Sequence, residues 1–426
     1  MPCFDFAYGS GRVQLDLPEN ARYQELRGHN EPPIEDIPAA LRAALEAPIH
    51  EKPLRGWLQP GDQVTLIISD MSRFWMRQDL VIPALVEYME TECGIRTEDL
   101  VILVANGTHI GGDEAELRTL VTDAVYDRVR VVNHDCLAED LVYLGTTSRG
   151  TEVVVNPLAV GRKVVALGAA TQHVMAGFGG GRKSILPGIA SRKTVVYNHN
   201  GKFIDDPHSR TGIVDGNPIH NDMLYAARAA HLAYIVNVIN DSNKTPIYAV
   251  AGDVDLAHRV GREFLSSQCQ VPANMSDIVI STNGGYPLDQ NIYQSVKGMT
   301  AAEATVKEGG VIIMLSKCND GHGGKVFYET FRDEKNLQRM MDTFIATPPT
   351  ETIIDQWQSQ IFARLLMRAT VVFVSDAPDD MVSDLHMVPA HSMEEALAKA
   401  DEILAAKGIK DGSILSIPDG VSVMVV

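Results

Sequence analysis

The chain has 426 residues, 45% of them hydrophobic, so it can bury a large core and is expected to form two or three globular domains. Its formal net charge of −18 argues against nucleic acid and anionic membranes as partners. The five cysteines show no CxxC spacing, which argues against a disulfide framework and fits a reducing compartment. The first residues, MPCFDFAYGS, lack the pattern of a signal peptide, and no apolar run approaches the roughly 18 residues of a membrane span. A cytoplasmic location is therefore expected.

The first 60 residues are interrupted by prolines and predict one or two short strands around 12–17, a loop, and one helix around 38–47. From residue 63 onward, short runs rich in Val, Ile and Leu alternate with helical patterns. Such alternation is typical of βαβ units with a mainly parallel sheet. The predicted strands are 64–69, 100–104, 129–132, 164–167 and 234–239, and the predicted helices include 78–92, 112–122 and 218–231.

The second half repeats this rhythm. Its predicted strands are 277–281, 311–315 and 371–374, and its predicted helices are 289–307, 334–346, 351–368 and 393–406. The segment 268–274 has no periodicity and is the best hinge candidate. The prediction is an α/β fold of two domains, each with a mainly parallel sheet flanked by helices, and an active-site cleft between them. The N-terminal domain is predicted at 1–267, joined by the tail 413–426, and the C-terminal domain at 275–412.

Polar residues follow several of the predicted strands. Asp70 and Arg73 come after the first run of the parallel pattern, the sequence Asn-Gly-Thr-His ending at His109 comes after the second, and His173 follows 164–167. Ligands of open α/β sheets bind outside the carboxyl ends of the strands, so these residues are candidates for one site. The alternative for Asp70 and Arg73 is an N-cap and a surface side chain.

The sequence GFGGGRKS at 177–184 is close to a P-loop, but Arg182 stands where a P-loop needs its second glycine. A different phosphate-holding loop is therefore favoured, and a plain glycine-rich turn is the simpler alternative. Backbone amides can close on an anion where glycines lack a Cβ, and Arg182 and Lys183 add positive charge there.

Three histidines are candidates for chemistry. His109 and His173 follow two different strands and could flank a substrate as an acid/base pair, although a lone loop histidine is more often structural. His199, within YNHNGK, is a weak metal ligand on its own, because a zinc site needs three or four protein ligands.

The second half adds a polar helix face and a tryptophan. Tyr293, Gln294 and Lys297 share one face of a predicted helix, because residues three or four apart are neighbours there. A solvated face is the alternative. Trp357 has polar neighbours and could line a cleft or simply pack near the hinge.

The order and spacing of these residues resemble the nickel-dependent lactate racemase family over nearly the whole chain. The residues that carry the resemblance are Asp70 and Arg73, Thr108-His109, His173, Lys183 in the GGGRKS loop, His199, and Tyr293-Gln294 with Lys297. The resemblance implies an isomerase, a racemase or epimerase of a 2-hydroxy acid. It also implies a nickel pincer nucleotide cofactor (pyridinium-3,5-bisthiocarboxylic acid mononucleotide nickel), attached covalently at Lys183, and transient partners that make this cofactor.

The resemblance also assigns roles to residues. His199 would ligate nickel, and one protein histidine suffices because the cofactor supplies the other donors of a square-planar site. Catalytic roles fall to His109, His173 and Lys297. Substrate binding falls to Arg73, Tyr293, Gln294, Lys297 and Trp357, and cofactor binding to Asp70, Arg73, Gly179, Gly180, Lys183 and His199.

The implied reaction inverts C2 by removing a hydride and returning it to the opposite face, while a histidine takes the hydroxyl proton. Ser72, Phe74 and Trp75 depart from the usual first motif of the family, and Ile110 follows His109 where a basic residue is common. A larger or more apolar hydroxy acid, or a sugar acid, is therefore expected. Two other functions remain open at this point: a P-loop-like NTPase or kinase that uses 177–184, and a non-catalytic protein that binds a small anion.

Overall fold

A computed structural model describes residues 3–17, 22–29 and 31–426, and the chain divides into two compact units. The larger unit comprises residues 30–199 and 206–268, and the smaller unit comprises residues 1–29, 200–205 and 269–426. Each unit is built on its own six-stranded sheet.

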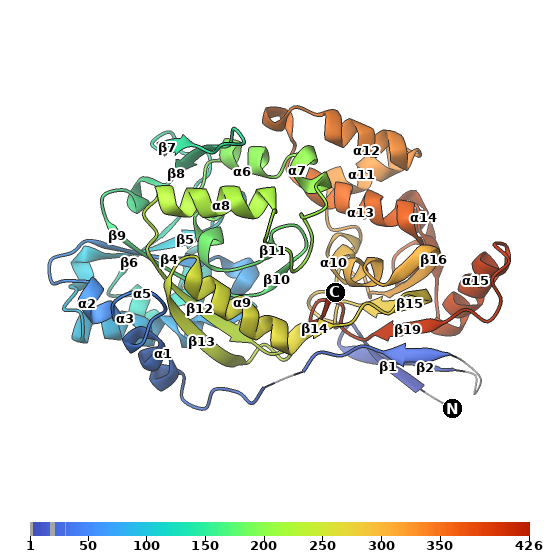
Figure 1. Cartoon of the computed structure of the whole chain (residues 1–426), viewed down its shortest axis with the longest axis horizontal. Helices are drawn as coiled ribbons and strands as arrows, with labels where there is room; N and C mark the ends of the chain where they lie inside the picture. Colours follow the sequence, from blue (N-terminus) through green and yellow to red (C-terminus); the bar gives the residue numbers. More distant parts are fainter. Residues whose placement is uncertain (1–2, 18–21, 30) are drawn as a thin grey trace. The chain divides into compact units, whose positions relative to one another are not determined.

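The sheet of the larger unit has the order β13-β12-β9-β4-β5-β6 (Figure 1). All its pairings are parallel except that of β12 with the edge strand β13. The strands are β4 (Val64–Ser69), β5 (Leu100–Ala105), β6 (Arg130–Asn133), β9 (Lys163–Ala169), β12 (Tyr234–Asn240) and β13 (Pro246–Asp253). The chain adds β5 and β6 on one side of β4 and then returns to add β9 and β12 on the other. The strand order therefore reverses between β4 and β9, the point at which open α/β sheets bind their ligands.

Helices cover both faces of this sheet. One face packs its alternate strand residues against a group of helices, and a second group lies on the other face. The first group is α1 (Ile37–Glu46), α2 (Leu54–Trp57), α3 (Ile82–Thr91), α4 (Glu114–Val121) and α5 (Asp123–Tyr126). On the opposite face α9 (Leu256–Cys269) approaches closely, since a Cβ on Gly261 would lie 3.2 Å from Val250 Cγ1. The helix α8 (Pro218–Ala229) packs against the turn that carries Lys183.

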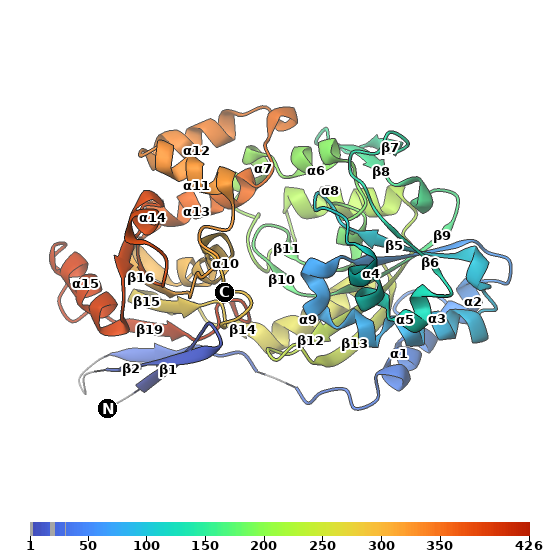
Figure 2. The ribbon, with the colours of Figure 1, turned by 180° about the vertical axis from the view of Figure 1, so that it is seen from behind.

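The sheet of the smaller unit is parallel throughout, with the order β18-β17-β16-β15-β19-β3. Its strands β16, β15 and β19 are labelled in Figure 2. The strands are β3 (Tyr23–Glu25), β15 (Ser276–Thr282), β16 (Val306–Leu315), β17 (Thr370–Val374), β18 (Val388–Ala390) and β19 (Ile414–Ile417). One face forms a core with α15 (Met393–Ala405) and with the hairpin of β1 (Cys3–Tyr8) and β2 (Gly11–Asp16). The helices α10 (Ile292–Glu303) and α13 (Gln356–Arg368) also pack against this sheet.

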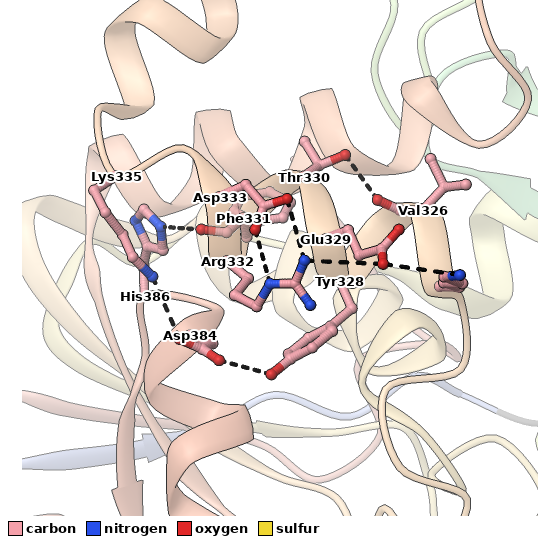
Figure 3. Close-up of polar contacts among 11 residues, drawn as sticks. Val326, Tyr328, Glu329, Thr330, Phe331, Arg332, Asp333, Lys335, Asp384 and His386 are labelled. Carbon is pink, nitrogen blue, oxygen red and sulfur yellow. Dashed lines mark hydrogen bonds and ion pairs between the residues drawn. The ribbon is translucent and has the colours of Figure 1, made fainter.

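Polar contacts fasten α11 (Lys325–Asp333) to α14 (Asp379–Asp384) in the smaller unit (Figure 3). The hydroxyl of Tyr328 donates to Asp384 at 2.7 Å, and His386 Nε2 donates to the carbonyl of Phe331 at 2.9 Å. The buried face of α11 carries Phe331, whose ring lies 4.9 Å from that of Phe362 on α13. These contacts hold the outer helix over an aromatic cluster.

Short elements complete the described chain. They are β7 (Val142–Thr146), β8 (Glu152–Val155), β10 (Gln172–His173), β11 (Gly177–Phe178), α6 (Arg192–Asn198), α7 (Gly201–Asp205), β14 (Gln270–Val271), α12 (Leu337–Ala346) and β20 (Met424–Val425). Short 3-10 turns lie at η1 (Met71–Met76), η2 (Gln78–Leu80), η3 (Thr97–Asp99), η4 (Pro157–Ala159), η5 (Gly181–Ser184) and η6 (Pro349–Glu351). In residues 3–17, 22–29 and 31–426, no helix is long and apolar enough to cross a membrane.

The predicted α/β class, with mainly parallel sheets flanked by helices, is confirmed, and a cleft shared by the two units stays a prediction. The unit boundaries differ from the predicted domains. The tail strand β19 pairs with β15 and β3. Residues 1–29 and the tail 413–426 therefore belong to the smaller unit, whereas both were predicted to belong to the N-terminal domain. The physical reason is that the apolar residues of the β1–β2 hairpin face the sheet of the smaller unit. The segment predicted as a hinge contains the unit boundary and the short strand β14, and hinge motion stays a prediction.

Candidate functional site

Two neighbouring strands of the larger unit bring Asp70 and His109 together. The strands β4 and β5 pair in parallel, with Ser69 opposite Ala105, so the residues that follow them emerge at the same edge of the sheet. The Oδ2 atom of Asp70 lies 2.6 Å from Nδ1 of His109. Asp70 is buried, while the side chain of His109 is 54% exposed and therefore accessible to a ligand.

This contact fixes the tautomer of the neutral imidazole. A carboxylate only accepts, so Nδ1 of His109 donates and the lone pair is left on Nε2. Burial by itself raises the pKa of Asp70, but hydrogen bonds from His109 and from the Ser72 hydroxyl outweigh it and hold this pKa below its usual value. Asp70 is therefore an anion at neutral pH, and His109 is arranged to act as a base through Nε2.

Hydrogen bonds to two other segments hold the turn that carries His109. Gly107, with φ +58°, donates its amide to Gly188, and Asn106 accepts from the amide of His134 at 3.0 Å. The His134 ring is buried, and its Nε2 donates to the carbonyl of Ala190 at 3.0 Å. The His109 turn is thus bonded directly to the segment that follows Lys183.

The second predicted acid/base residue, His173, lies in the short hairpin that follows β9. Its Nδ1 accepts the amide of Ala176 at 3.3 Å, so the neutral ring carries its proton on Nε2. By surface area His173 is only half-buried, but its ring is closely surrounded by protein. This burial, together with the charges of Lys183 and Arg73, holds the pKa of His173 well below its usual value. His173 therefore presents a donor where His109 presents an acceptor.

The glycine-rich loop is pressed onto the end of the sheet. Gly179 donates its amide to Thr171 at 2.6 Å, and Gly181 donates to the side chain of Asn237 on β12 at 3.2 Å. Gly180 has φ +77°, and a Cβ there would lie 2.7 Å from the carbonyl of Ala169. Side chains are excluded at this point, and the chain continues into the turn η5, which carries Lys183.

The structure departs from the loop prediction at Arg182. Its side chain does not face outward to add charge at an anion. It is fully buried and donates to the carbonyls of Ala176 and Phe178, at 3.0 Å each. The loop also ends in a single 3-10 turn, whereas a P-loop opens an α-helix, so the geometry does not support an NTPase.

His199 caps the carboxyl end of α6. Its Nδ1 lies 3.0 Å from the Val195 carbonyl and donates to it, so the lone pair is on Nε2, the form of histidine that ligates metals. Burial lowers the pKa of His199 to about 3 and keeps the ring neutral. Among the residues that the structure describes, no three or more His, Cys, Asp or Glu side chains are grouped to hold a metal. A metal at His199 would need donors from a cofactor, and this fits a pincer nucleotide attached at Lys183.

The predicted residues of the second half lie in the smaller unit. On α10, the ammonium of Lys297 donates to Gln294 Oε1 at 2.6 Å, so these two side chains share a face as predicted. The hydroxyl of Tyr293 donates to Asp355 at 2.8 Å, just before α13. Trp357 is half-buried near the start of α13. Their contact with a substrate stays a prediction.

A cavity of about 280 Å³ lies beside His109. It is lined by Asp70, Met71, Ser72, Asn106, His109, Ile110, Gly112 and Glu116. Of the residues expected to set the substrate, Ser72 and Ile110 line it. The side chains of Phe74 and Trp75 do not, because Phe74 packs on the core and Lys244 lies over the ring of Trp75. Sequence reasoning missed Glu116, which no motif distinguishes from the other acidic residues of its helix.

Comparisons with known proteins identify the family of the chain. Two protein-family models match the chain, the lactate racemase N-terminal domain over residues 8–212 and the lactate racemase C-terminal domain over residues 271–425. A lactate racemase from Thermoanaerobacterium thermosaccharolyticum is 40% identical over 433 residues, covering 100% of this chain and 99% of that protein. A lactate racemase from Lactiplantibacillus plantarum is 42% identical over 391 residues, covering 90% of each.

Solved structures give the same result. The lactate racemase apoprotein from T. thermosaccharolyticum matches with a TM-score of 0.91 and 38% identity, covering 100% of both chains. A Thermotoga maritima protein of 16% identity shares the fold, with a TM-score of 0.62 over 92% of this chain and 97% of its own. By sequence over its full length and by fold, the chain belongs to the lactate racemase family.

Proposed function

We propose that this protein is a racemase or epimerase that inverts C2 of a 2-hydroxy acid, using a nickel pincer nucleotide bound to Lys183. The observation that carries the proposal is the 2.6 Å contact of His109 with Asp70, at the sheet edge from which the His173 hairpin and the Lys183 loop also emerge. Membership of the lactate racemase family supports it. Lactate is the substrate named for the relatives, and a related 2-hydroxy acid is proposed here.

The two histidines divide the proton chemistry between them. For one enantiomer, Nε2 of His109 takes the hydroxyl proton of the substrate, and the Asp70 carboxylate stabilises the imidazolium that forms. In the tautomer described above, His173 is proposed to donate a hydrogen bond from Nε2–H to the substrate. For the other enantiomer the hydroxyl lies on the opposite side, and His173 is the proposed base. This role requires the His173 tautomer with its proton on Nδ1, which forfeits the hydrogen bond from Ala176 and leaves the lone pair on Nε2. The bound cofactor would supply the acceptor for the hydride that leaves C2.

Positive charge is needed to hold the carboxylate of the substrate. Arg73 is exposed, and its Nη1 is oriented by a 3.0 Å hydrogen bond to the Ser72 hydroxyl, at the edge of the cavity. A guanidinium can bind a carboxylate through two parallel hydrogen bonds. Gln294 and Lys297 are proposed to contact and polarise the same substrate, together with Tyr293 and Trp357.

His199 and Lys183 are the proposed cofactor residues. The lone pair on His199 Nε2 is directed by the Val195 carbonyl through Nδ1, and the glycine loop sets the position of Lys183. Asp70, Arg73, Gly179 and Gly180 are also proposed to contribute to cofactor binding. Enzymes that make the cofactor are the proposed transient partners.

The test uses the full chain co-expressed with cofactor-making enzymes. Mass spectrometry should find added mass on the Lys183 peptide, and a chiral assay with lactate, malate, phenyllactate and gluconate should show loss of optical purity. His109→Gln should lose at least about 100-fold in rate. A matched control is His391→Gln, since His391 also pairs with an aspartate, Asp379, but at an exposed position of the smaller unit. An unmodified Lys183 together with unchanged optical purity on every acid would overturn the proposal.

A further inference from the structure

The reaction proposed above leaves one buried charge unexplained. Arg182 has no exposed surface and is the largest fully buried side chain of the described chain. No carboxylate lies within ion-pair distance of it in the described residues, and burial, with a smaller contribution from the charge of Arg262, lowers its pKa to about 9. A buried cation without an anion is costly unless its donors are satisfied by other groups. Its partners should therefore indicate what it does.

Those partners are the carbonyls of the glycine-rich loop. Nη2 of Arg182 donates to Ala176 and to Phe178 at 3.0 Å each, and Nη1 lies 3.5 Å from the carbonyl of Gly180. The planar fork of a guanidinium can bond several acceptors in fixed directions at once, which an ammonium on a flexible stem does less well. Arg182 thus links three points of the loop that ends at Lys183.

His258, on α9, is a further partner of Arg182, whose Nε atom has none in the described structure. Its Nε2 lies 2.9 Å from Nη1 of Arg182 and 2.8 Å from the carbonyl of Gly179. A guanidinium only donates and a carbonyl only accepts. If Nε2 of His258 is protonated, it donates to the carbonyl of Gly179; if it is not, it accepts from Arg182. Burial, with the charge of Arg182, keeps the pKa of His258 well below its usual value, so the ring stays neutral in both tautomers.

We propose that Arg182 and His258 are positioning residues, which hold the loop 176–180 in the conformation that presents Lys183 for cofactor attachment. Neither residue touches substrate in this proposal, and the part that concerns attachment rests on the proposed function. Arg182 has a second effect, since its charge is among those that lower the pKa of His173. In this proposal each part of the motif GGGRKS has its own role. The glycines let the backbone approach the end of the sheet closely, Arg182 holds the conformation of the loop, and Lys183 forms the covalent bond to the cofactor.

The test compares Arg182→Lys with Arg162→Lys in the full chain. Arg162 is a matched control because its guanidinium also donates to two carbonyls, those of Val64 and Asp99, at the other end of the sheet. Hydrogen exchange of the peptide spanning 171–188 is measured on protein made without cofactor-making enzymes. Arg182→Lys should raise this exchange roughly tenfold or more, because bonds of a charged group are lost, and Arg162→Lys should leave it unchanged.

Cofactor attachment is the second measurement. In protein made with the biosynthesis enzymes, the modified fraction of Lys183 should fall at least about tenfold in Arg182→Lys and stay at the wild-type level in Arg162→Lys. His258→Gln should keep most of the attachment, since an amide both donates and accepts, while His258→Leu should lose it.

The outcomes separate this proposal from the proposed function. Unchanged loop exchange in Arg182→Lys, or an equal rise in Arg162→Lys, would overturn the positioning role. Unchanged attachment in Arg182→Lys and His258→Leu would overturn the link to Lys183. If wild-type Lys183 is never modified while Arg182→Lys still loosens the loop, the proposed function fails and the role of Arg182 in shaping the loop stands.

Discussion

The backbone amide of Gly107 donates to the carbonyl oxygen of Gly188 at 2.8 Å. Gly107 belongs to the turn that carries His109, and Gly188 belongs to the segment that follows Lys183. His134 makes a second connection, because its amide bonds to Asn106 and its ring to Ala190. The proposed base and the proposed cofactor anchor are therefore carried by backbone segments that are hydrogen-bonded to each other. Changes in this connection should affect stability, and changes at Asp70 should affect catalysis.

Asp70→Asn tests the role of the carboxylate in catalysis. The variant keeps the size of the side chain but removes the negative charge that holds the Nδ1 proton of His109. We expect the rate of racemisation to fall by roughly 100- to 10,000-fold, with a small change in melting temperature. The control is Asp79→Asn, since Asp79 pairs with Arg77 and does not line the cavity. Turnover within twofold of the wild type would show that His109 does not need this carboxylate.

His134→Leu tests the buried connection. It leaves the Ala190 carbonyl and the Asn156 side chain without their ring partner, and an unmet buried polar group costs about 1–3 kcal/mol. The free energy of unfolding of the larger unit should fall by about 2 kcal/mol. The chain has three tryptophans, and in a Trp357→Phe background only those of the larger unit report urea unfolding. An equal fall in the free energy of unfolding in the exposed control His391→Leu would show that the effect does not come from the buried contacts of His134.

Much of the larger unit could be predicted because its central strands are buried on both faces. β4 reads Val-Thr-Leu-Ile-Ile-Ser, with five of its residues buried, so it stands out as an apolar run. β13 was missed because it returns antiparallel to β12 after a short turn, without the helix that the βαβ pattern leads one to expect. The unit to which β3 belongs could not be predicted, since its three residues are exposed and carry no pattern.

Some features of the candidate site could likewise be predicted from the sequence, and others could not. Asp70, His109 and His173 could be predicted, because polar residues after parallel strands must meet at one sheet edge. The burial of Arg182 and its contact with His258 could not, because the two residues come from distant segments and no local periodicity connects them. A charged residue beside a reactive lysine is naturally interpreted as a ligand contact, and only its burial indicates a structural role.

The cavity beside His109 allows a prediction about substrate choice. Glu116 lines it, and its carboxylate lies over Gly112, so a substrate with a second carboxylate would meet like charge. Glu116→Lys should raise the ratio of kcat/KM for malate to that for lactate roughly tenfold. Glu114→Lys is the matched control, because Glu114 lies on the same helix, pairs with Arg118 and does not line the cavity. An equal shift in both variants would indicate a general charge effect and not a contact in the cavity.

Buried neutral histidines predict acid sensitivity of the fold. Burial lowers the pKa of His220 to about 2 and also lowers that of His134. Since the ordinary value is about 6.5, the unfolded chain binds these protons below that pH while the folded chain does not. Stability should therefore be fully present above about pH 6.5 and should fall on acidification, by up to about 1.4 kcal/mol per pH unit for each such histidine.

His220→Gln should reduce the slope of the unfolding free energy against pH, because one buried histidine no longer contributes to it. The measurement is the free energy of urea unfolding of the larger unit at several values between about pH 6.5 and 4.5, in the Trp357→Phe background. His391→Gln serves as the control, because its side chain is 61% exposed and should leave the slope unchanged. The Nδ1 atom of His220 has no hydrogen-bond partner in the described structure, so a glutamine there loses no side-chain bond made by that atom. A slope identical in wild type and His220→Gln would mean that His220 takes up its proton in the folded state, against the burial seen here.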